Sequence, residues 1–430
     1  MVFTSLYSIV DGVFIANFAN ESSFAAVNLI FPVIFIIGSI GFIFGTGGSA
    51  LVAKLLGEGK KEKANETFSL IVYTTIIVGL IFSVAFVFLV EPICHAMANR
   101  SANTTEQMVN ESIKYGRLLA SAQVMFMLQH VFQAFFMVNE KSRLGFIFVF
   151  AGGSTNILLD ALFIGLFRWG VIGAAFATIS GYFVAGIGPL IYFFVNKNAL
   201  IYLGKCHVVL KDIGQTIYNG MSEFVSSISM SIVSVVFNII LLRTYGEVGV
   251  SAYGIIMYVS FVFLAIFIGY STGIAPVVSY NYGAKNTDEL NNILRKSMTI
   301  IIGLGLLMFT LSLLSAEPFS RIFASGDAQL LELATTAMRI YSFVFLVCGF
   351  SIFISCFFTA LNNGSISATI SFLRTIVFEI GSVLILPLII GDKGIWYSIL
   401  VGEIFSTISA FIFLFIKSKK YGYKLFKFSK

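Results

Sequence analysis

The sequence predicts an all-α protein that crosses a membrane about twelve times, and three observations lead to this fold class. Of the 430 residues, 58% are hydrophobic and only 11% are charged, whereas soluble domains carry about 25% charged residues. Apolar stretches near the roughly 20 residues that one crossing needs follow one another along the chain. Lys and Arg gather in alternate loops between these stretches. Because lipid offers no hydrogen-bond partners to the backbone, we expect each stretch to be a helix.

Twelve apolar stretches with short polar connections can be counted along the chain. The first has no basic flank and no convincing cleavage site, so we expect a shortened first helix there and not a signal peptide. The short alternating strands of a membrane barrel are absent. The expected helices cover residues 1–18, 24–53, 67–90, 113–138, 145–166, 171–195, 213–242, 251–280, 298–316, 338–361, 366–390 and 395–416.

The positive charges of the loops predict the orientation of the chain. Loops after even-numbered helices, together with the C-terminal tail, hold 18 of the 27 Lys and Arg residues, and the other side holds eight. Only Arg374 lies deep within an expected helix, because Lys114, Arg117 and Arg339 fall within the first five residues of theirs and are counted with the loops. The positive-inside rule then places both termini in the cytoplasm. The net charge of +6 therefore reflects topology, and we expect membrane lipids as neighbours and no nucleic acid partner.

The two halves of the chain resemble each other, which predicts two lobes of six helices in the same orientation. At an offset of 226 residues the matching pairs are Ala26/Ala252, Thr46/Thr272, Gly47/Gly273, Gly57/Gly283, Tyr115/Tyr341 and Ala134/Ala360. Parallel halves of this kind form a central cavity and alternate access by rocking. We expect a first lobe over 1–196, a cytoplasmic linker over 197–212, a second lobe over 213–416 and a basic tail over 417–430.

Carboxylates inside the apolar stretches are the strongest functional signal. An ionised acid at the centre of a bilayer costs about 2.5–3.5 kcal/mol on insertion scales. Such residues therefore face cavities, form pairs, or bind ions and protons. Five acids of this kind occur, namely Asp11, Asp160, Glu223, Glu379 and Glu403. They predict a protein that moves charge or charged solutes.

Several segments together resemble the MATE family, the multidrug and toxic compound extrusion transporters. Residues 5–18 (SLYSIVDGVFIANF) carry an acid followed by Gly and aromatic residues, and residues 154–167 (STNILLDALFIGLF) carry an Asn-x-x-x-Asp pattern. Residues 170–180 (GVIGAAFATIS) are similar to the start of the family's sixth helix. Residues 220–238 (GMSEFVSSISMSIVSVVFN) and 279–286 (SYNYGAKN) resemble a bacterial branch described as MepA-like. The resemblance covers the whole chain except for the start of the family's longer first helix.

The resemblance implies a bilobed twelve-helix antiporter in the inner membrane of a bacterium. Such a protein exports cationic or amphipathic organic compounds in exchange for Na⁺ or H⁺ and uses no other cofactor. The resemblance also implies a cation site in the first lobe, which maps onto Asp11, Asn156, Asp160 and Thr178. Nothing in the sequence points to an obligate oligomer, and we expect a monomer.

The residue types of this implied site suit two kinds of cation. Asn156 and Asp160 are spaced i, i+4 and so share one helix face. Two carboxylates with the neutral oxygens of Asn and Thr fit a hard ion such as Na⁺ better than zinc or copper. Two carboxylates close together in a medium of low dielectric also favour the binding of a proton. The sequence leaves both ions open.

Other polar residues of the apolar stretches receive weaker interpretations. Glu223, about ten residues into the seventh stretch, is expected to contact substrate or cation in the second lobe, with a helix-bridging role as an equal alternative. Arg374 is expected to form a structural charge pair with Glu379 or Glu403, because a buried charge needs compensation. Gln129 is typical of interhelical hydrogen bonding.

Other functional classes fit the sequence less well. A lipid-linked oligosaccharide flippase of related architecture is the main alternative, but it needs a cationic, Arg-lined cavity for pyrophosphate. Arg374 is the only Lys or Arg more than five residues from the end of an apolar stretch. Catalytic spacings and nucleotide-binding Gly-rich loops are absent, which disfavours an enzyme and an ATP-driven pump. The four cysteines show no metal-binding spacing. Because the expected first helix is short, a further hypothesis is that the protein is a non-functional remnant of such a transporter.

Overall fold

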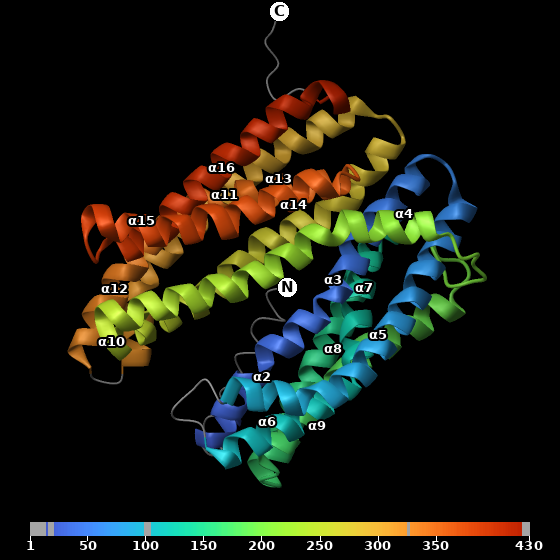
Figure 1. Ribbon diagram of the computed structural model, residues 1–430. Coiled ribbons are helices and arrows are strands. Elements are labelled where there is room, and N and C mark those ends of the chain that lie inside the picture. The colour runs from blue at the N-terminus through green and yellow to red at the C-terminus, as the bar shows by residue number, and fades with distance from the viewer. Residues whose placement is uncertain (1–13, 16–20, 99–104, 325–326, 424–430) are drawn as a thin grey trace, which may run out of the picture. The chain divides into compact units, whose positions relative to one another are not determined.

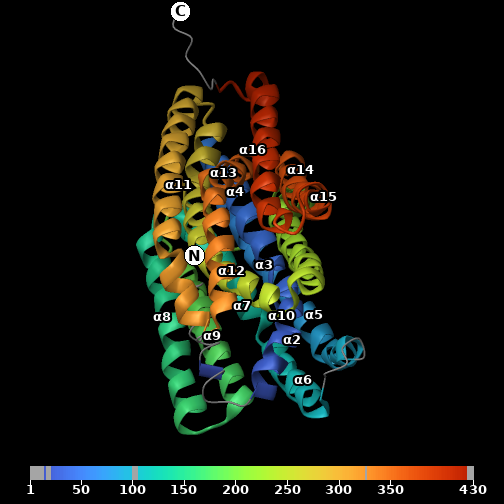
Figure 2. The same ribbon diagram turned by 90° about the vertical axis from the view of Figure 1, so that its left-hand side faces the viewer.

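The computed structural model describes residues 14–15, 21–98, 105–324 and 327–423 of the chain. In this part of the chain the backbone is almost entirely helical and forms no strand, as Figures 1 and 2 show. The predicted all-α membrane fold class is confirmed. Nearly all of the first apolar stretch, including Asp11, lies outside the described residues.

The chain divides into two compact units, and the division falls between Gly220 and Met221. The first unit contains nine α-helices and two π-helical segments among its described residues, counting the start of α10. They are α2 (Glu21–Gly38), α3 (Ile40–Phe42), η1 (Ile43–Gly47), α4 (Gly48–Gly57), α5 (Lys61–Ala98), α6 (Glu106–Ser121), α7 (Gln123–Val138), α8 (Ser142–Asp160), η2 (Ala161–Leu166), α9 (Gly170–Val195) and α10 (Leu210–Gly283). Helices α8 and α9 run side by side in Figure 2.

The second unit is built from the remainder of α10 and the helices that follow it. These are α11 (Thr287–Ala324), α12 (Ala328–Ser342), η3 (Phe343–Leu346), α13 (Cys348–Ala360), α14 (Gly364–Phe372), η4 (Leu373–Glu379), α15 (Ile380–Ile390) and α16 (Gly394–Tyr421). The 3-10 segment η3 joins α12 to α13, and the π-helical segment η4 joins α14 to α15. Helix α16 packs along α15 and η4, as the red and orange ribbons of Figure 1 show.

The number of membrane crossings agrees with the expected twelve. Among the described residues, eight helices are long and apolar enough to cross a membrane, and two bent pairs raise this number to ten. Helix α10 is counted once, although its 74 residues would extend about 110 Å at 1.5 Å per residue. Gly246, with φ of 64°, breaks α10 into two helices. With α10 counted as two helices, the described residues hold up to eleven crossings, which is consistent with the expected twelve because nearly all of the first stretch lies outside them.

The connection before α10 packs against the first unit. Sequence reasoning expected residues 197–212 to form a linker, but α10 already begins at Leu210. The side chain of Leu203 is buried, and the backbone N–H of Tyr202 donates to Oδ1 of Asn65 in α5 at 3.0 Å. These contacts attach the connection to the first unit.

The internal repeat has counterparts in the backbone of both units. The pair α6/α7 breaks at Ala122 with a bend of 52°, and the pair α12–η3/α13 breaks at Val347 with a bend of 41°. The two breaks lie almost one repeat offset apart. Thr46 and Thr272, one of the matching pairs, each donate to the carbonyl four residues earlier at 2.8 Å. Each unit therefore repeats local details of the other as well as its helix order.

Candidate functional site

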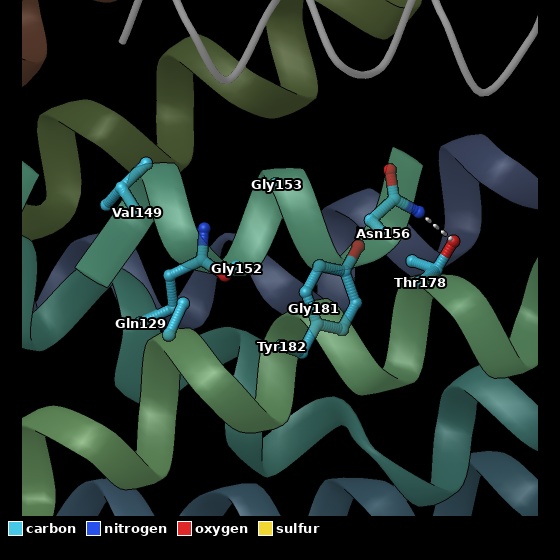
Figure 3. A pocket seen from close by; sticks show the side chains of 9 residues that line it. Gln129, Val149, Gly152, Gly153, Asn156, Thr178, Gly181 and Tyr182 are labelled. Carbon is cyan, nitrogen blue, oxygen red and sulfur yellow. Dashed lines mark hydrogen bonds between the residues drawn. The ribbon is translucent and has the colours of Figure 1, made fainter. Parts of the chain in front are cut away.

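A small pocket lies between α8 and α9 of the first unit, with α7 beside it (Figure 3). It has room for about one water molecule. The lining residues are Gln129, Val149, Gly152, Gly153, Asn156, Thr178, Gly181, Tyr182 and Ala185. All of them belong to the first unit.

Glycines bring α8 and α9 close enough to form this pocket. A Cβ on Gly152 would lie 2.8 Å from the carbonyl oxygen of Gly181, and a Cβ on Gly181 would lie 2.9 Å from that of Gly152. Real Cβ atoms do not approach an oxygen so closely, so the two helices can meet here only without side chains. Small residues at such crossings are typical of helix packing in membranes. The close approach places Asn156 of α8 opposite Thr178 of α9.

Asn156 and Thr178 form the polar end of the pocket. Both are buried, and Nδ2 of Asn156 donates to Oγ1 of Thr178 at 3.5 Å. This distance exceeds the usual 2.7–3.2 Å, so the bond is weak. Oδ1 of Asn156 accepts no hydrogen bond from the described residues, and Figure 3 shows it turned away from Thr178. An unsatisfied buried acceptor costs about 1–3 kcal/mol, so this oxygen favours binding of a cation or a water molecule.

Asp160 lies one helical turn beyond Asn156 on the same face of α8. Its side chain is fully buried, and it ends α8 where the backbone widens into η2. π-helical segments of this kind occur frequently at functional sites. Asp160 is not among the residues that line the pocket. Of the four residues implied by the family resemblance, two are therefore within hydrogen-bonding distance, one lies a turn away, and Asp11 is outside the described residues.

Sequence reasoning missed most of the pocket lining. Gln129 was expected to bridge helices, yet it lies at the pocket. Tyr182 was not singled out, and its ring packs against that of Phe126 with centroids 4.8 Å apart. The sequence does contain Gly152 and Gly181, which allow the close approach of α8 and α9. Two glycines indicate a helix crossing only once it is known that their helices face each other.

Glu223 lies in the second unit, on the early part of α10, and its side chain is partly exposed. No salt bridge within the described residues includes it. The neighbouring Ser222 shares a hydrogen bond with Thr359 of α13 at 3.2 Å, which fixes this part of α10 against α13. Contact between Glu223 and a substrate or cation stays a prediction.

The second unit contains a buried ion pair between η4 and α16. Nε and Nη2 of Arg374 both lie 2.7 Å from the same Oε1 of Glu403, and Oγ of Ser351 donates to Oε2 at 3.2 Å. The backbone of Glu379 packs against α16, since a Cβ on Gly402 would lie 3.0 Å from the Cα of Glu379. Among the described residues the salt bridge of Arg374 is with Glu403 and not with Glu379.

Two loop residues outside the membrane-spanning helices have shifted pKa values. Nζ of Lys60 lies 2.6 Å from Oε2 of Glu58, and this hydrogen bond holds the pKa of Glu58 below its ordinary value, with Lys54 adding to the effect. Burial raises the pKa of the Cys206 thiol, and the charge of Glu66 adds to it. Neither residue lies near the pocket, so these shifts concern the loops.

Known proteins are similar to this chain over nearly its whole length. The sequence model of the MatE family matches residues 1–162 and 224–384. The "Multidrug export protein MepA" of Staphylococcus haemolyticus is 25% identical over 422 residues, covering 97% of this chain and 90% of that protein. The protein of the same name from Staphylococcus saprophyticus is 26% identical over 429 residues, covering 97% and 91%.

Solved structures show the same fold. One described as "Crystal structure of MATE in complex with MaL6" has a TM-score of 0.93 at 21% identity and covers 98% of this chain and 94% of its own. A MOP superfamily transporter from Pyrococcus furiosus, described with "reverse polarity of binding pocket", has a TM-score of 0.91 at 21% identity and covers 98% and 93%. At these identities the likeness concerns the fold alone. Since the family model matches more than half of the chain, this protein belongs to the MatE family, as its sequence motifs indicated.

Proposed function

We propose that this protein is a secondary active transporter that exports cationic or amphipathic organic compounds in exchange for Na⁺ or H⁺. Family membership and the multidrug export proteins among its relatives support the transport of such compounds. The observation that carries the exchange is the pocket of the first unit. It presents the unsatisfied oxygen of Asn156 and the hydroxyl of Thr178, with Asp160 one turn away.

The size and chemistry of the pocket favour a small cation. Room for about one water molecule is far below the 300–1,000 Å³ of pockets that hold organic ligands. The polar groups of Asn156 and Thr178 offer neutral oxygens, and the carboxylate of Asp160 lies close by. Oxygen ligands without thiolate or imidazole suit Na⁺, and a buried carboxylate also suits a proton. The organic compound therefore binds elsewhere, and the pocket serves the coupling ion.

Exchange through this site has a sufficient energy source. Each net positive charge that moves inward through 100 mV releases about 2.3 kcal/mol, so export of a singly charged cation uses the potential when two ions enter for each compound. Since about 1.4 kcal/mol corresponds to a factor of ten, this drives roughly 50-fold accumulation of the exported compound. Coupling requires only that ion and compound favour opposite states of the protein. In this proposal the two units alternate access by rocking, as expected for parallel six-helix repeats.

The proposal includes the setting of the protein. It is an integral membrane protein, which we place in the inner membrane of a bacterium with both termini in the cytoplasm. We propose that it works as a monomer in contact with lipids, on small organic molecules, and without enzymatic activity. The distribution of Lys and Arg over the loops supports the orientation.

The charge arrangement weighs against the flippase alternative. A lipid-linked pyrophosphate needs free positive charge in the cavity. Arg374, the Lys or Arg that lies deep within an apolar stretch, is bound by Glu403 through two N–H groups. Its charge is therefore already compensated, and we propose no flippase activity.

Efflux of a fluorescent organic cation from cells tests this proposal. The chain is expressed in a bacterium that lacks its main exporters, alongside Asp160→Asn, with membrane levels of both measured by immunoblot. We expect the chain to lower dye accumulation and the variant to leave accumulation at the level of cells without it. Thr155→Val is a suitable control, because Thr155 sits on the same helix but donates only to the carbonyl of Ala151. Equal efflux by Asp160→Asn would contradict the assigned site.

A further inference from the structure

The helices that frame the pocket in the first unit have counterparts in the second unit. Helices α9 and α16, with the turn before α16, share three glycines at an offset of 221 residues, namely Gly170/Gly391, Gly173/Gly394 and Gly181/Gly402. The first pair has positive φ in both units, 56° and 73°. The last pair lies where each helix touches the helix before it. A Cβ on Gly402 would lie 3.0 Å from the Cα of Glu379, and a Cβ on Gly181 would lie 2.9 Å from the carbonyl oxygen of Gly152. Helix α16 is therefore the counterpart of α9.

The preceding helices correspond at an offset of 222 residues. Glu140 and Asn362 both have left-handed backbone, with φ of 56° and 57°, in the turn before the helix. Helix α8 starts two residues after Glu140, and α14 starts two residues after Asn362. Both helices pass into a π-helical segment, but η2 follows the 19 residues of α8 whereas η4 follows the 9 residues of α14. The turn, and not the π-helical segment, therefore sets the correspondence of α8 with the helix that starts at α14.

These offsets identify what stands in the second unit at the place of the pocket. Gly152, which lines the pocket and has no side chain, corresponds to Arg374 at offset 222. Tyr182, on the opposite wall, corresponds to Glu403 at offset 221. In the first unit this place is an open pocket, whereas in the second it contains a guanidinium held by a buried carboxylate at 2.7 Å.

We propose that Arg374 is a built-in cation, whose side chain fills in the second unit the place that the pocket leaves open in the first. Removing its side chain exposes a binding site for a guanidinium-type cation, formed by Glu403 and Ser351. The comparison with the first unit rests on the proposed ion site there, but the binding site itself does not. It follows that this part of the second unit needs no external cation.

The chemistry of the site determines which cation restores it. Without Arg374, the nearly buried carboxylate of Glu403 keeps Ser351 as a donor but loses its countercharge. Breaking a buried pair from one side leaves an uncompensated charge and is strongly destabilising. Free guanidinium presents the same planar N–H donors as the lost side chain, whereas an alkali ion does not. The side chain of Arg374 is 21% exposed, so the vacated space opens to the surroundings.

Thermal unfolding of the purified full chain in detergent tests this inference. A thiol-reactive dye reports unfolding, because Cys94 and Cys348 are buried in the folded protein. Arg374→Ala is heated with and without low-millimolar guanidinium chloride, and with urea or NaCl at the same concentration. We expect the variant to melt several degrees below the parent chain, and guanidinium alone to recover at least half of that shift with a saturable dose response. A variant that does not respond to guanidinium overturns the proposal.

Two further variants make the result specific. Arg374→Ala/Glu403→Gln has lost both charges, and its melting temperature should not respond to guanidinium. Arg117→Ala is the matched control, because Arg117 pairs with Glu91 on the exposed surface at 2.5 Å. A guanidinium response in either variant as large as in Arg374→Ala also overturns the proposal. None of these readouts needs transport, so a chain that fails to export compounds can still show the site.

A second measurement applies if Arg374→Ala alone does not survive purification. The yield of folded, monodisperse protein after solubilisation is then compared with and without guanidinium in the extraction buffer. The proposal requires a higher yield with guanidinium and no such gain with urea. Equal yields contradict it.

Discussion

At the scale of single residues, the nitrogen and the oxygen of the Asn156 side-chain amide have different roles in the site. The nitrogen of Asn156 donates to Thr178, and this leaves its oxygen without a hydrogen bond from the described residues. The hydroxyl of Thr178 both accepts this bond and keeps a free lone pair for an ion. The two side chains therefore face each other across a weak hydrogen bond and present their oxygens to the same small space.

Removing the Thr178 hydroxyl should weaken the binding of the coupling ion. Thr178→Val keeps the shape of the side chain but removes one ligand oxygen and leaves the amide of Asn156 without its acceptor. A loss of about 1–3 kcal/mol raises the ion concentration for half-maximal transport about 5- to 150-fold. Transport rates over a series of Na⁺ concentrations and pH values check this. An unchanged half-maximal concentration would show that Thr178 is not a ligand.

Sequence reasoning could name Asn156, Asp160 and Thr178 because the family resemblance assigns a role to each. It could not choose between Glu379 and Glu403 as the partner of Arg374. Glu379 lies five residues further along the same helical segment, while Glu403 lies on α16, and only the packing of α16 against η4 brings Glu403 within 2.7 Å. Partners on different helices depend on rotation about each helix axis, which an apolar sequence hardly specifies.

At the scale of helices, the crossing of α8 and α9 creates the pocket. Gly152 and Gly181 allow contact of the two backbones, and the polar side chains beyond the crossing are then held in register. A methyl group at either position would force the helices apart. The geometry of the ion site is therefore a property of the helix pair.

Gly181→Ala should destabilise the protein and distort the pocket. The added Cβ would lie 2.9 Å from the carbonyl oxygen of Gly152, and such overpacking costs about 1–3 kcal/mol. Gly214→Ala is the matched control in α10, because nothing lies within 4 Å of its Cβ position and Ala favours a helix by about 1 kcal/mol. Melting temperatures should fall for the first variant and hold or rise for the second. Equal melting temperatures would argue against a tight crossing.

The helices were predictable as apolar stretches, but their ends and irregularities were not. Helix α5 covers Lys61–Ala98 where the sequence predicted 67–90, because polar residues continue a helix into water without leaving an apolar signal. The π-helical segments η1, η2 and η4 were not predicted. In a helix that is apolar on all sides, the pattern of residues does not reveal a change from i→i+4 to i→i+5 bonding.

At the scale of the whole molecule, the distribution of charge predicts the side on which each loop lies. The connection between the two six-helix halves is expected in the cytoplasm and contains Cys206, a half-buried free thiol. The other three cysteines lie within membrane-spanning helices. Cys206 is therefore a natural probe of orientation.

Labelling with a charged, membrane-impermeant thiol reagent should reach Cys206 only in inverted membrane vesicles. Burial raises its pKa above the ordinary thiol value, so less thiolate is present at neutral pH and labelling should be slow there. The rate should rise as the pH increases toward that pKa. Cys206→Ser should abolish the signal. Labelling of Cys206 in right-side-out vesicles would contradict the proposed topology.

The central claim is the exchange of an organic cation for Na⁺ or H⁺ at the first unit's pocket, and transport in proteoliposomes tests it most directly. The full chain and Asp160→Asn are reconstituted, and uptake of a fluorescent organic cation is followed under an imposed Na⁺ gradient and separately under an imposed pH gradient. We expect one of the two gradients to drive uptake by the parent chain and neither to drive it in the variant. No uptake under either gradient, or equal uptake by Asp160→Asn, would contradict the claim.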